Sequence, residues 1–325
     1  MNEQFHQDPS LSKDVLHPLM QRKNGPGLWL FAVQYSLLLG SAALVVWRAQ
    51  AVWWQWFLPL VVFATMTMGM FAATHETGHN TAFRSRWLNA LGSWLVTLPI
   101  FYVPTLFQHF HFAHHRHTHE PGKDPEITVA GQASPPITSS FLMYFSWLSG
   151  LPLLMFKTGL IVLAAIGAPR AFVWEQFFFY VPERARTRAI WEARAVLLFH
   201  LGVATIAYLW LPGLWLLLLG QWLGHAMLAF YLVFEHNGLP HEGTILQRTR
   251  TLYTSRWMCL LMWNMPYHAE HHAYPAIPWH NLPALHELWK DRVFWIQKGL
   301  PPLHKDIVSQ LMRGEEFSEE ARKAG

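Results

Sequence analysis

Three clusters of histidines stand just outside long apolar runs in this 325-residue chain: His75 and His79; His111, His114 and His115; and His268, His271 and His272. Within an α-helix, residues at positions i, i+3 and i+4 share one face, so each cluster directs its imidazoles towards one point. Neutral imidazole suits iron, copper, zinc and nickel, and one metal ion takes about three or four protein ligands. Eight histidines therefore predict a site for two metal ions.

A ninth ligand is predicted at His236, which falls where an apolar run ends, level with the three clusters. A histidine at a helix C-terminus is also favoured by the helix dipole, so a capping role is the alternative. His225 lies eleven residues earlier, on nearly the same helix face and about 16 Å deeper along the axis. We interpret His225 as a candidate for the lining of a substrate tunnel.

The second cluster is followed by further polar residues that can support a metal site. His119 lies four residues after the last histidine of the cluster, but a Pro-Gly pair ends any helix there. We treat His119 as a reserve ligand, with solvation or a hydrogen bond to a ligand as the alternative. Asp124 and Glu126 can accept the distal N–H of a ligating histidine and fix its tautomer, unless they form a simple solvated turn.

The third cluster is predicted to lie on a helix of about two turns. Asn264 can cap this helix, Pro266 can open it and Pro275 can close it. Glu270 points away from the histidine face, so we expect it at the surface or beside a ligand rather than on a metal.

The composition is that of a membrane protein. Charged residues make up only 14% of the chain and aromatic residues 15%, with 18 tryptophans. The single cysteine, Cys259, excludes internal disulfides, a four-cysteine iron-sulfur cluster and a rubredoxin-like module. Reducing electrons, where the chemistry needs them, must therefore come from another protein. The net charge of +4 arises from basic residues between the apolar runs, and nucleic acid is not needed to explain it.

Hydropathy predicts an all-α integral membrane fold with four transmembrane helices in two hairpins. The four runs are close to the length of about 20 residues that crosses a bilayer: 28–47, 51–73, 195–210 and 214–234. Two further apolar regions, 88–107 and 141–168, contain internal prolines, and we expect interfacial or re-entrant segments there. With this topology the histidines gather on one side, in a helical cap. Tryptophans near the ends of the four runs form an interfacial belt or pack between helices.

The charge distribution predicts the orientation. One group of basic residues lies on the histidine side of the spans: Arg84, Arg86, Arg116, Lys123, Arg170, Arg184, Arg186, Arg188, Arg248, Arg250 and Arg256. The opposite turns carry only Arg48, so the positive-inside rule places the histidines in the cytosol, and a bacterial inner membrane is favoured over the endoplasmic reticulum.

Three parts of the chain are expected: a polar cytosolic segment 1–27, a catalytic membrane domain 28–289, and a cytosolic C-terminal helix with a tail, 290–325, that frays from Glu315. The aromatic and arginine-rich segment 177–194 suits a helix lying in the headgroup layer, or equally ordinary packing under a cap.

The order HETGH, HFAHH and HAEHH, with DPE after the second box and EHNGL before the third, resembles the membrane fatty acid desaturase superfamily. The resemblance covers about residues 51–289. It implies a non-haem di-iron centre on the cytosolic face, above four transmembrane helices that guide a lipid chain. By this resemblance one set of residues binds iron: His75, His79, His111, His114, His115, His236, His268, His271 and His272.

The resemblance also implies an activity. Two iron ions would use O₂ and two external electrons to remove hydrogen from an unactivated CH₂ group, and a sealed apolar tunnel would orient the chain and exclude water. A fatty acyl or related lipid chain is the expected substrate. The expected electron donor is a ferredoxin, a rubredoxin, or cytochrome b5 with its reductase. Some relatives carry an asparagine one turn before the histidine that matches His236, but this chain has Leu232.

Desaturation is the first hypothesis, and other activities stay open. The same histidines would serve a hydroxylase, ketolase or oxidative decarboxylase acting on a fatty acid, terpenoid or carotenoid. The HExxH pattern of His75, Glu76 and His79 also fits a membrane zinc protease with Glu76 as general base, but that leaves the other two clusters without a role. A catalytically silent metal-binding or transport protein is a third hypothesis.

Overall fold

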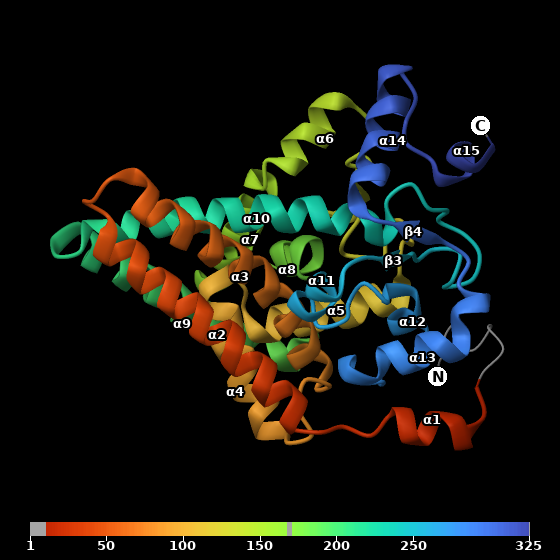
Figure 1. Ribbon diagram of the computed structural model, residues 1–325, viewed down its shortest axis with the longest axis horizontal. Helices are drawn as coiled ribbons and strands as arrows, with labels where there is room; N and C mark the ends of the chain where they lie inside the picture. The colour runs from red at the N-terminus through yellow and green to blue at the C-terminus, as the bar shows by residue number, and fades with distance from the viewer. Residues whose placement is uncertain (1–10, 168–170, 325) are drawn as a thin grey trace.

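The computed structural model describes residues 11–167 and 171–324 of the chain. Four helices within this part are long and apolar enough to cross a membrane, which confirms the predicted spans. In Figure 1 these four helices extend to the left of the view, and the short elements of the cap gather on the right. The four are α2 (Gly25–Arg48), α3 (Trp53–His79), α9 (Glu183–Leu209) and α10 (Trp215–His236).

Two of the spans are longer than hydropathy predicted, and the extra turns matter for the site. Helix α3 continues through the HETGH box to His79, so the first histidine cluster is the last turn of a span. Helix α9 begins at Glu183. The expectation of a separate interfacial helix over 177–194 is therefore wrong, since residues 183–194 are the first turns of α9. Glutamate, arginine and alanine dominate these turns and favour helix, and Pro182 stands at the N-cap.

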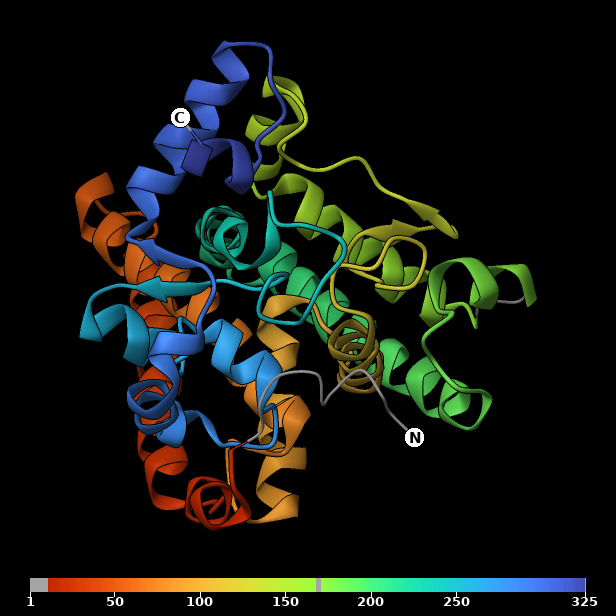
Figure 2. The ribbon, with the colours of Figure 1, turned by 90° about the vertical axis from the view of Figure 1, so that its right-hand side faces the viewer.

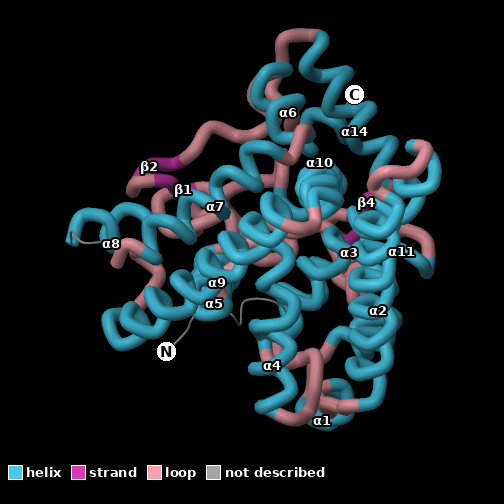
Figure 3. Tube along the Cα trace, turned by 90° about the vertical axis from the view of Figure 1, so that its left-hand side faces the viewer, coloured by secondary structure: helices cyan, strands magenta, loops and turns pink. Residues whose placement is uncertain are grey.

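The two hairpins differ in how their helices pack. Helices α2 and α3 run against each other, whereas α9 leaves α10 after the turn at η3 (Pro212–Leu214) and packs against α7 (Leu151–Ala165). Helix α10 packs instead against α3, and Figure 3 shows it between α2 and α3 on one side and α7 and α9 on the other. Gly224 permits this approach, because a Cβ there would lie 2.7 Å from Thr67 Cγ2.

The two proline-containing regions each form a bent pair of helices. Helix α4 (Arg86–Thr97), with η2 (Leu98–Ile100), meets α5 (Pro104–His117) at 96°, and α6 (Phe141–Leu148) meets α7 at 69°. Such bends suit the interfacial or re-entrant segments that we predicted, although by length and composition each pair could also be one broken span. The last residue of the predicted segment 141–168 lies outside the described residues. The first bend turns α5 so that the second histidine cluster reaches the end of α3.

The tryptophans near the span ends are exposed, so the interhelical packing that we considered for them is wrong. The exposed fractions are high at both ends of the spans: Trp29 57%, Trp47 69%, Trp53 63%, Trp54 61%, Trp210 68% and Trp215 44%. Exposed indole rings at these positions are what an interfacial belt requires.

A cap covers the histidine end of the spans (Figure 2). It consists of α11 (Arg256–Leu261), α12 (His268–Ala273), η4 (Trp279–Asn281), α13 (Leu282–Trp289) and η5 (Lys290–Arg292). Buried Trp263 anchors the cap to the first span, because its indole N–H donates to Gln34 Oε1 of α2 at 2.8 Å. Helix α12 begins at His268, two residues after the predicted start at Pro266, and Tyr267 is its N-cap residue. Asn264 instead has a φ of 59° and donates to the carbonyl of Trp279.

The remaining described elements are short. Helices α1 (Lys13–Leu19) and α8 (Ala171–Phe177) precede α2 and α9. Strands β1 (Thr128–Val129) and β2 (Gln132–Ala133) pair antiparallel, and β3 (Thr251–Tyr253) pairs parallel with β4 (Ile296–Lys298). These strands are small additions to the predicted all-helical fold.

The C-terminal region packs against α10 and the residues that follow it, although we expected a frayed tail. Helices α14 (Leu300–Met312) and α15 (Glu319–Ala324) follow β4. Phe317 is 2% exposed, and Glu319 Oε2 lies 3.0 Å from Arg250 Nη2, with both side chains buried. A buried guanidinium without a partner is costly, so the Arg250 to Glu319 ion pair explains why this charged segment folds back.

Candidate metal centre

The nine histidines that we predicted as ligands gather at the junction of the spans and the cap. They come from the last turn of α3, from α5, from the last residue of α10 and from α12. They form two adjacent groups. The first group is His75, His79, His111, His115 and His271, and the second is His114, His236 and His272, with His268 beside it.

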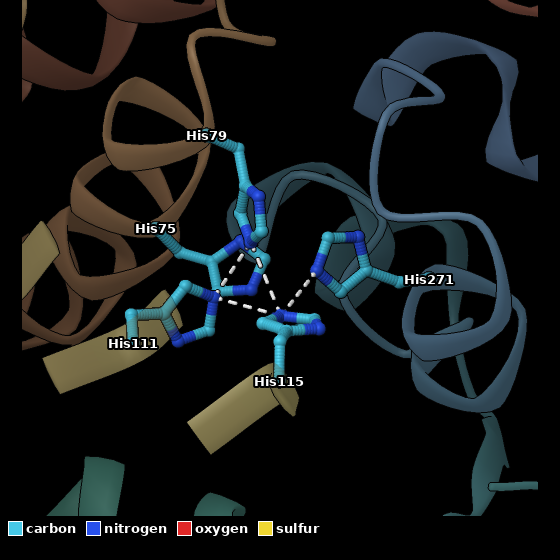
Figure 4. Close-up of side chains that lie close together, drawn as sticks. All are labelled: His75, His79, His111, His115 and His271. Atoms are coloured by element: carbon cyan, nitrogen blue, oxygen red, sulfur yellow. Dashed lines mark hydrogen bonds between the residues drawn. The ribbon is translucent and has the colours of Figure 1, made fainter. Parts of the chain in front are cut away.

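The first group is compact. Its five ligand nitrogens all lie within 4.8 Å of one another. His79 Nε2 is 2.7 Å from His111 Nε2 and 3.1 Å from His115 Nε2, and His271 Nε2 is also 3.1 Å from His115 Nε2 (Figure 4). Histidines from three helices, α3, α5 and α12, thus direct their Nε2 atoms towards one point.

The second group is also compact. His114 Nε2 lies 3.3 Å from His272 Nε2, and His268 Nε2 lies 2.9 Å from His236 Nε2. The His115 and His272 rings stack with centroids 4.2 Å apart, so the two groups are neighbours. Such proximity is what a pair of metal ions requires.

Two outer hydrogen bonds fix which nitrogen of a ring faces inwards. His236 Nδ1 lies 2.8 Å from the carbonyl oxygen of Arg248, which can only accept, so the proton is on Nδ1. His114 Nδ1 lies 3.0 Å from Asp124 Oδ2 and 3.1 Å from Oδ1. In both rings Nε2 therefore keeps its lone pair and points it into the group.

Two further rings are also oriented by hydrogen bonds at their Nδ1 atoms. His75 Nδ1 is 3.1 Å from Glu76 Oε1. His272 Nδ1 is 3.1 Å from Thr118 Oγ1, and that hydroxyl already donates to the carbonyl of His114 at 2.9 Å. Thr118 therefore accepts from the His272 Nδ1–H, and the lone pair of His272 Nε2 is also free to bind a metal.

This donor arrangement fits metal ions. Two unprotonated Nε2 atoms about 3 Å apart repel each other through their lone pairs. A metal cation between them removes this repulsion, because both lone pairs then bind the cation. The buried Nε2 of His75 has no hydrogen-bond partner among the residues that the structure describes. Imidazole nitrogen is a ligand for iron, zinc, copper and nickel, and two groups of donors suit two ions.

Burial keeps the third cluster in the form that binds metal. Desolvation, helped by the neighbouring imidazoles, lowers the pKa of His268, His271 and His272 well below the usual 6.5. Each of these side chains is at most 2% exposed. Neutral imidazole is the ligating species, so the cap supplies its donors without needing to lose a proton at neutral pH.

The polar residues after the second cluster have different roles. His119 has a φ of 59°, its backbone N–H donates to Asp124 Oδ2 at 2.6 Å, and its Nδ1–H donates to the Pro240 carbonyl at 3.1 Å. Desolvation lowers the pKa of His119 to about 4. Glu126 lies 3.5 Å from His114 Nδ1 and its side chain is 34% exposed. Asp124 is thus the direct partner of His114, and His119 holds the turn that positions Asp124.

Two other residues lie outside the donor groups. His225 is buried on α10, where its Nδ1–H donates to the Gln221 carbonyl and its Nε2 faces Lys157 Nζ at 3.2 Å. Glu270 is 0% exposed, so the expected surface position is wrong. Its carboxylate instead accepts from Thr251 and His286 beneath the cap.

The environment of Glu76 argues against the zinc protease. Its carboxylate accepts from Thr81 Oγ1 at 2.6 Å, from the Trp279 backbone N–H at 3.4 Å and from His75, and the side chain is 1% exposed. A general base must reach a metal-bound water, whereas these contacts orient Glu76 as the partner of His75.

A surface cleft is lined by His115, Thr118 and His272, with Arg116 and Arg248 in its wall. Two predicted ligands, one from each group, therefore lie close to a polar opening.

Sequence analysis did not find several of the residues that orient the rings. Glu76 was considered only as a protease base, and the roles of Thr118 and of the Arg248 carbonyl were not predicted. Thr118 stands one helical turn after His114, which is a usable clue, but a backbone carbonyl has no sequence signature.

The fold and the site define a class of helical membrane proteins with a histidine-rich metal centre at the membrane surface. The family model for fatty acid desaturase matches residues 51–296. The chain therefore belongs to the fatty acid desaturase family.

Curated relatives are similar at low identity. The chain is 27% identical to the sphingolipid delta(4)-desaturase of Komagataella phaffii over 72% of its own length and 61% of the relative's. It is 25% identical to the zeaxanthin 4-ketolase of Chlamydomonas reinhardtii over 81% of its length and 49% of the relative's. A sphingolipid delta(4)-desaturase of Oryza sativa subsp. japonica is 24% identical over 84% and 76%. The chain thus spans about half to three fifths of the first two relatives.

Proposed function

We propose that this protein is a membrane-bound di-iron oxidase that uses O₂ and electrons from another protein to desaturate a fatty acyl or related lipid chain. The observation that carries the proposal is the convergence of nine histidines, eight of them buried and His79 half-buried, into two adjacent groups with their lone pairs directed inwards. Membership of the desaturase family supports iron as the metal and a lipid as the substrate.

The residues of this chain have three tasks in that function. The nine histidines hold the metals: His75, His79, His111, His114, His115, His236, His268, His271 and His272. Glu76, Asp124, Thr118 and the Arg248 carbonyl keep the rings oriented, and the cap with the enclosing helices excludes water from the centre. The iron pair, when bound and reduced, supplies the oxidation by O₂ that no side chain can perform.

An oxygenating outcome is the second candidate. Some relatives are named as carotenoid ketolases, including the zeaxanthin 4-ketolase and a beta-carotene ketolase of Haematococcus lacustris. The same ligand groups would serve hydroxylation, ketone formation or oxidative decarboxylation, because the position of the substrate relative to the metals decides the product. The substrate would then be a fatty acid, terpenoid or carotenoid.

The electron donor is proposed to be a separate protein, such as a ferredoxin, a rubredoxin, or cytochrome b5 with its reductase. The sequence contains a single cysteine, Cys259, whereas an iron-sulfur cluster is held by several cysteines. The cleft lined by His115 and His272 offers a polar approach to the centre.

The proposed orientation places the metal centre in the cytosol, with a bacterial inner membrane as the favoured location. The basic residues near the starts of α4 and α9 lie at the same end of the spans as the histidines, whereas Arg48 stands at the other end. This asymmetry supports the positive-inside assignment. Arg170, which was counted with the basic residues, lies outside the described residues.

Product analysis tests the proposal. Membranes that contain the protein are given iron, a reducing system, O₂ and isotope-labelled lipids, and the products are identified by mass spectrometry. We expect a product two mass units lighter per new double bond for a desaturase, and one oxygen heavier for a hydroxylase. Iron-loaded protein that consumes no O₂ and alters no lipid under these conditions would instead favour metal storage.

A further inference from the structure

A buried lysine lies among the apolar helices, below the level of the metal centre. Lys157, in the middle of α7, is 3% exposed. Its neighbour His225 precedes His236 by eleven residues on α10, which corresponds to about 16 Å along the helix axis. An ionisable side chain at such a depth is expensive and needs a partner, and it commonly marks a functional site.

The partners of Lys157 within the described residues are uncharged. Its Nζ lies 3.3 Å from the Ile100 carbonyl oxygen, 3.2 Å from His225 Nε2 and 3.8 Å from the centre of the Tyr102 ring. Because the His225 Nδ1–H donates to the Gln221 carbonyl, His225 Nε2 accepts from the lysine. Two of these contacts are hydrogen bonds and the third is with the face of a ring, and no carboxylate in the described part of the chain forms an ion pair with Lys157.

A second polar group at this place also lacks a partner. Gln221 stands one turn before His225 on the same face of α10 and is 7% exposed. Its amide N–H donates to the Pro99 carbonyl, whereas its buried Oε1 accepts no hydrogen bond from any residue that the structure describes. The cluster therefore combines a cation that lacks a counter-ion with an amide oxygen free to accept.

The cluster is connected to the metal centre by aromatic rings. The ring of Tyr102 contacts that of Phe107 with centroids 4.9 Å apart. Phe107 stacks on His111, a predicted ligand, at 5.5 Å and 9°. Packed aromatic rings thus link the metal centre to the polar cluster at Lys157.

We propose that Lys157, positioned by His225, binds the carboxylate of an otherwise apolar substrate and thereby sets which carbon reaches the metals. A carboxylate would supply the missing counter-charge through a charge-assisted hydrogen bond to Nζ. The claim that the bound carboxylate is one end of the oxidised substrate rests on the proposed function. The claim that Lys157 binds a carboxylate does not.

Ligand binding to the full-length protein in nanodiscs tests the inference. Stearate and 1-octadecanol have equal chain lengths and differ only at the polar end. We expect the protein to bind stearate at least about 10-fold more tightly than 1-octadecanol, since charge-assisted bonds are the stronger ones. The variant Lys157→Met should remove this preference and leave 1-octadecanol binding unchanged. Lys305→Met, at an exposed position on α14, is the matched control and should retain the preference.

A Lys157→Met protein that still prefers stearate by the same factor would overturn the inference, as would wild-type protein without any preference. A measurement on the wild type alone guards against a variant that does not fold. The carboxyl carbon of bound [1-¹³C]stearate should titrate at lower pH than in protein-free nanodiscs, because a nearby cation stabilises the carboxylate. A bound carboxyl that titrates at equal or higher pH would contradict the pairing.

These outcomes are separable from the proposed function. A stearate preference that depends on Lys157, in a protein that oxidises no lipid, would leave the carboxylate site standing and refute the oxidase. Lipid oxidation without any effect of Lys157 on binding would refute the carboxylate site alone.

Discussion

Replacing His271 by alanine should remove metal from the centre and abolish turnover. His271 is the only member of the first group that the cap supplies, and its Nε2 lies 3.1 Å from that of His115. We expect the iron content to fall from about two ions per chain to at most about one. Product formation should fall by at least about 100-fold, because even residues that only orient a ligand cost 10- to 100-fold when they are lost. Metal analysis and product quantification on the same preparations measure both effects.

His17→Ala is the control for this prediction, because His17 is exposed on α1 and, within the described residues, its side-chain hydrogen bond is to the equally exposed Gln21. His304 is unsuitable as a control, since it is 8% exposed and joins Tyr144 to the Phe230 carbonyl. The His271→Ala protein must elute and melt like the wild type for the comparison to hold. A well-folded His271→Ala protein with both irons and full turnover would refute the assignment of the first group.

The second large effect is expected from Asp124→Asn. Asp124 is 1% exposed, accepts from His114 Nδ1 with both carboxylate oxygens, and accepts the backbone N–H of His119. The amide keeps the shape but loses the charge and offers only one accepting oxygen. We expect metal affinity to fall by about 10- to 100-fold, with a similar loss of activity at limiting iron. Competition with a chelator of known affinity measures the change.

Glu126→Gln is the matched control, because it removes one negative charge near His114 without removing a short hydrogen bond. Glu126 Oε2 lies 3.5 Å from His114 Nδ1 and its side chain is 34% exposed. Its variant should bind metal within about threefold of the wild type, as expected for a screened charge near the surface. Equal losses in both variants would mean that overall charge, and not the His114 to Asp124 hydrogen bond, controls affinity.

Much of the fold follows from local properties of the sequence. The four spans are uninterrupted apolar runs of membrane length, and hydropathy detects such runs without tertiary information. The convergence of the histidine clusters could be predicted because helical periodicity places His111 and His115 on one face, and because topology brings the span ends to one side. His236 followed from its place at the end of α10.

The remaining features depend on tertiary contacts. Residues 183–194 join α9 because the helix continues through polar turns, and composition alone does not distinguish that from a surface helix. The tail folds back because Arg250, far away in sequence, needs Glu319. The partner of His236 is a backbone carbonyl, which any residue could provide. Lys157 only interrupted an apolar run in the sequence, and its neighbours His225 and Tyr102 come from different segments.

The most direct test of the account is the metal content and coordination of the purified full-length protein expressed with iron. Elemental analysis, with X-ray absorption at the iron edge, measures both quantities. The account predicts about two iron ions per chain with nitrogen-rich coordination and no sulfur ligand. One zinc ion per chain, or no tightly bound metal in a folded protein, would contradict the claim that the nine histidines form one dinuclear iron site.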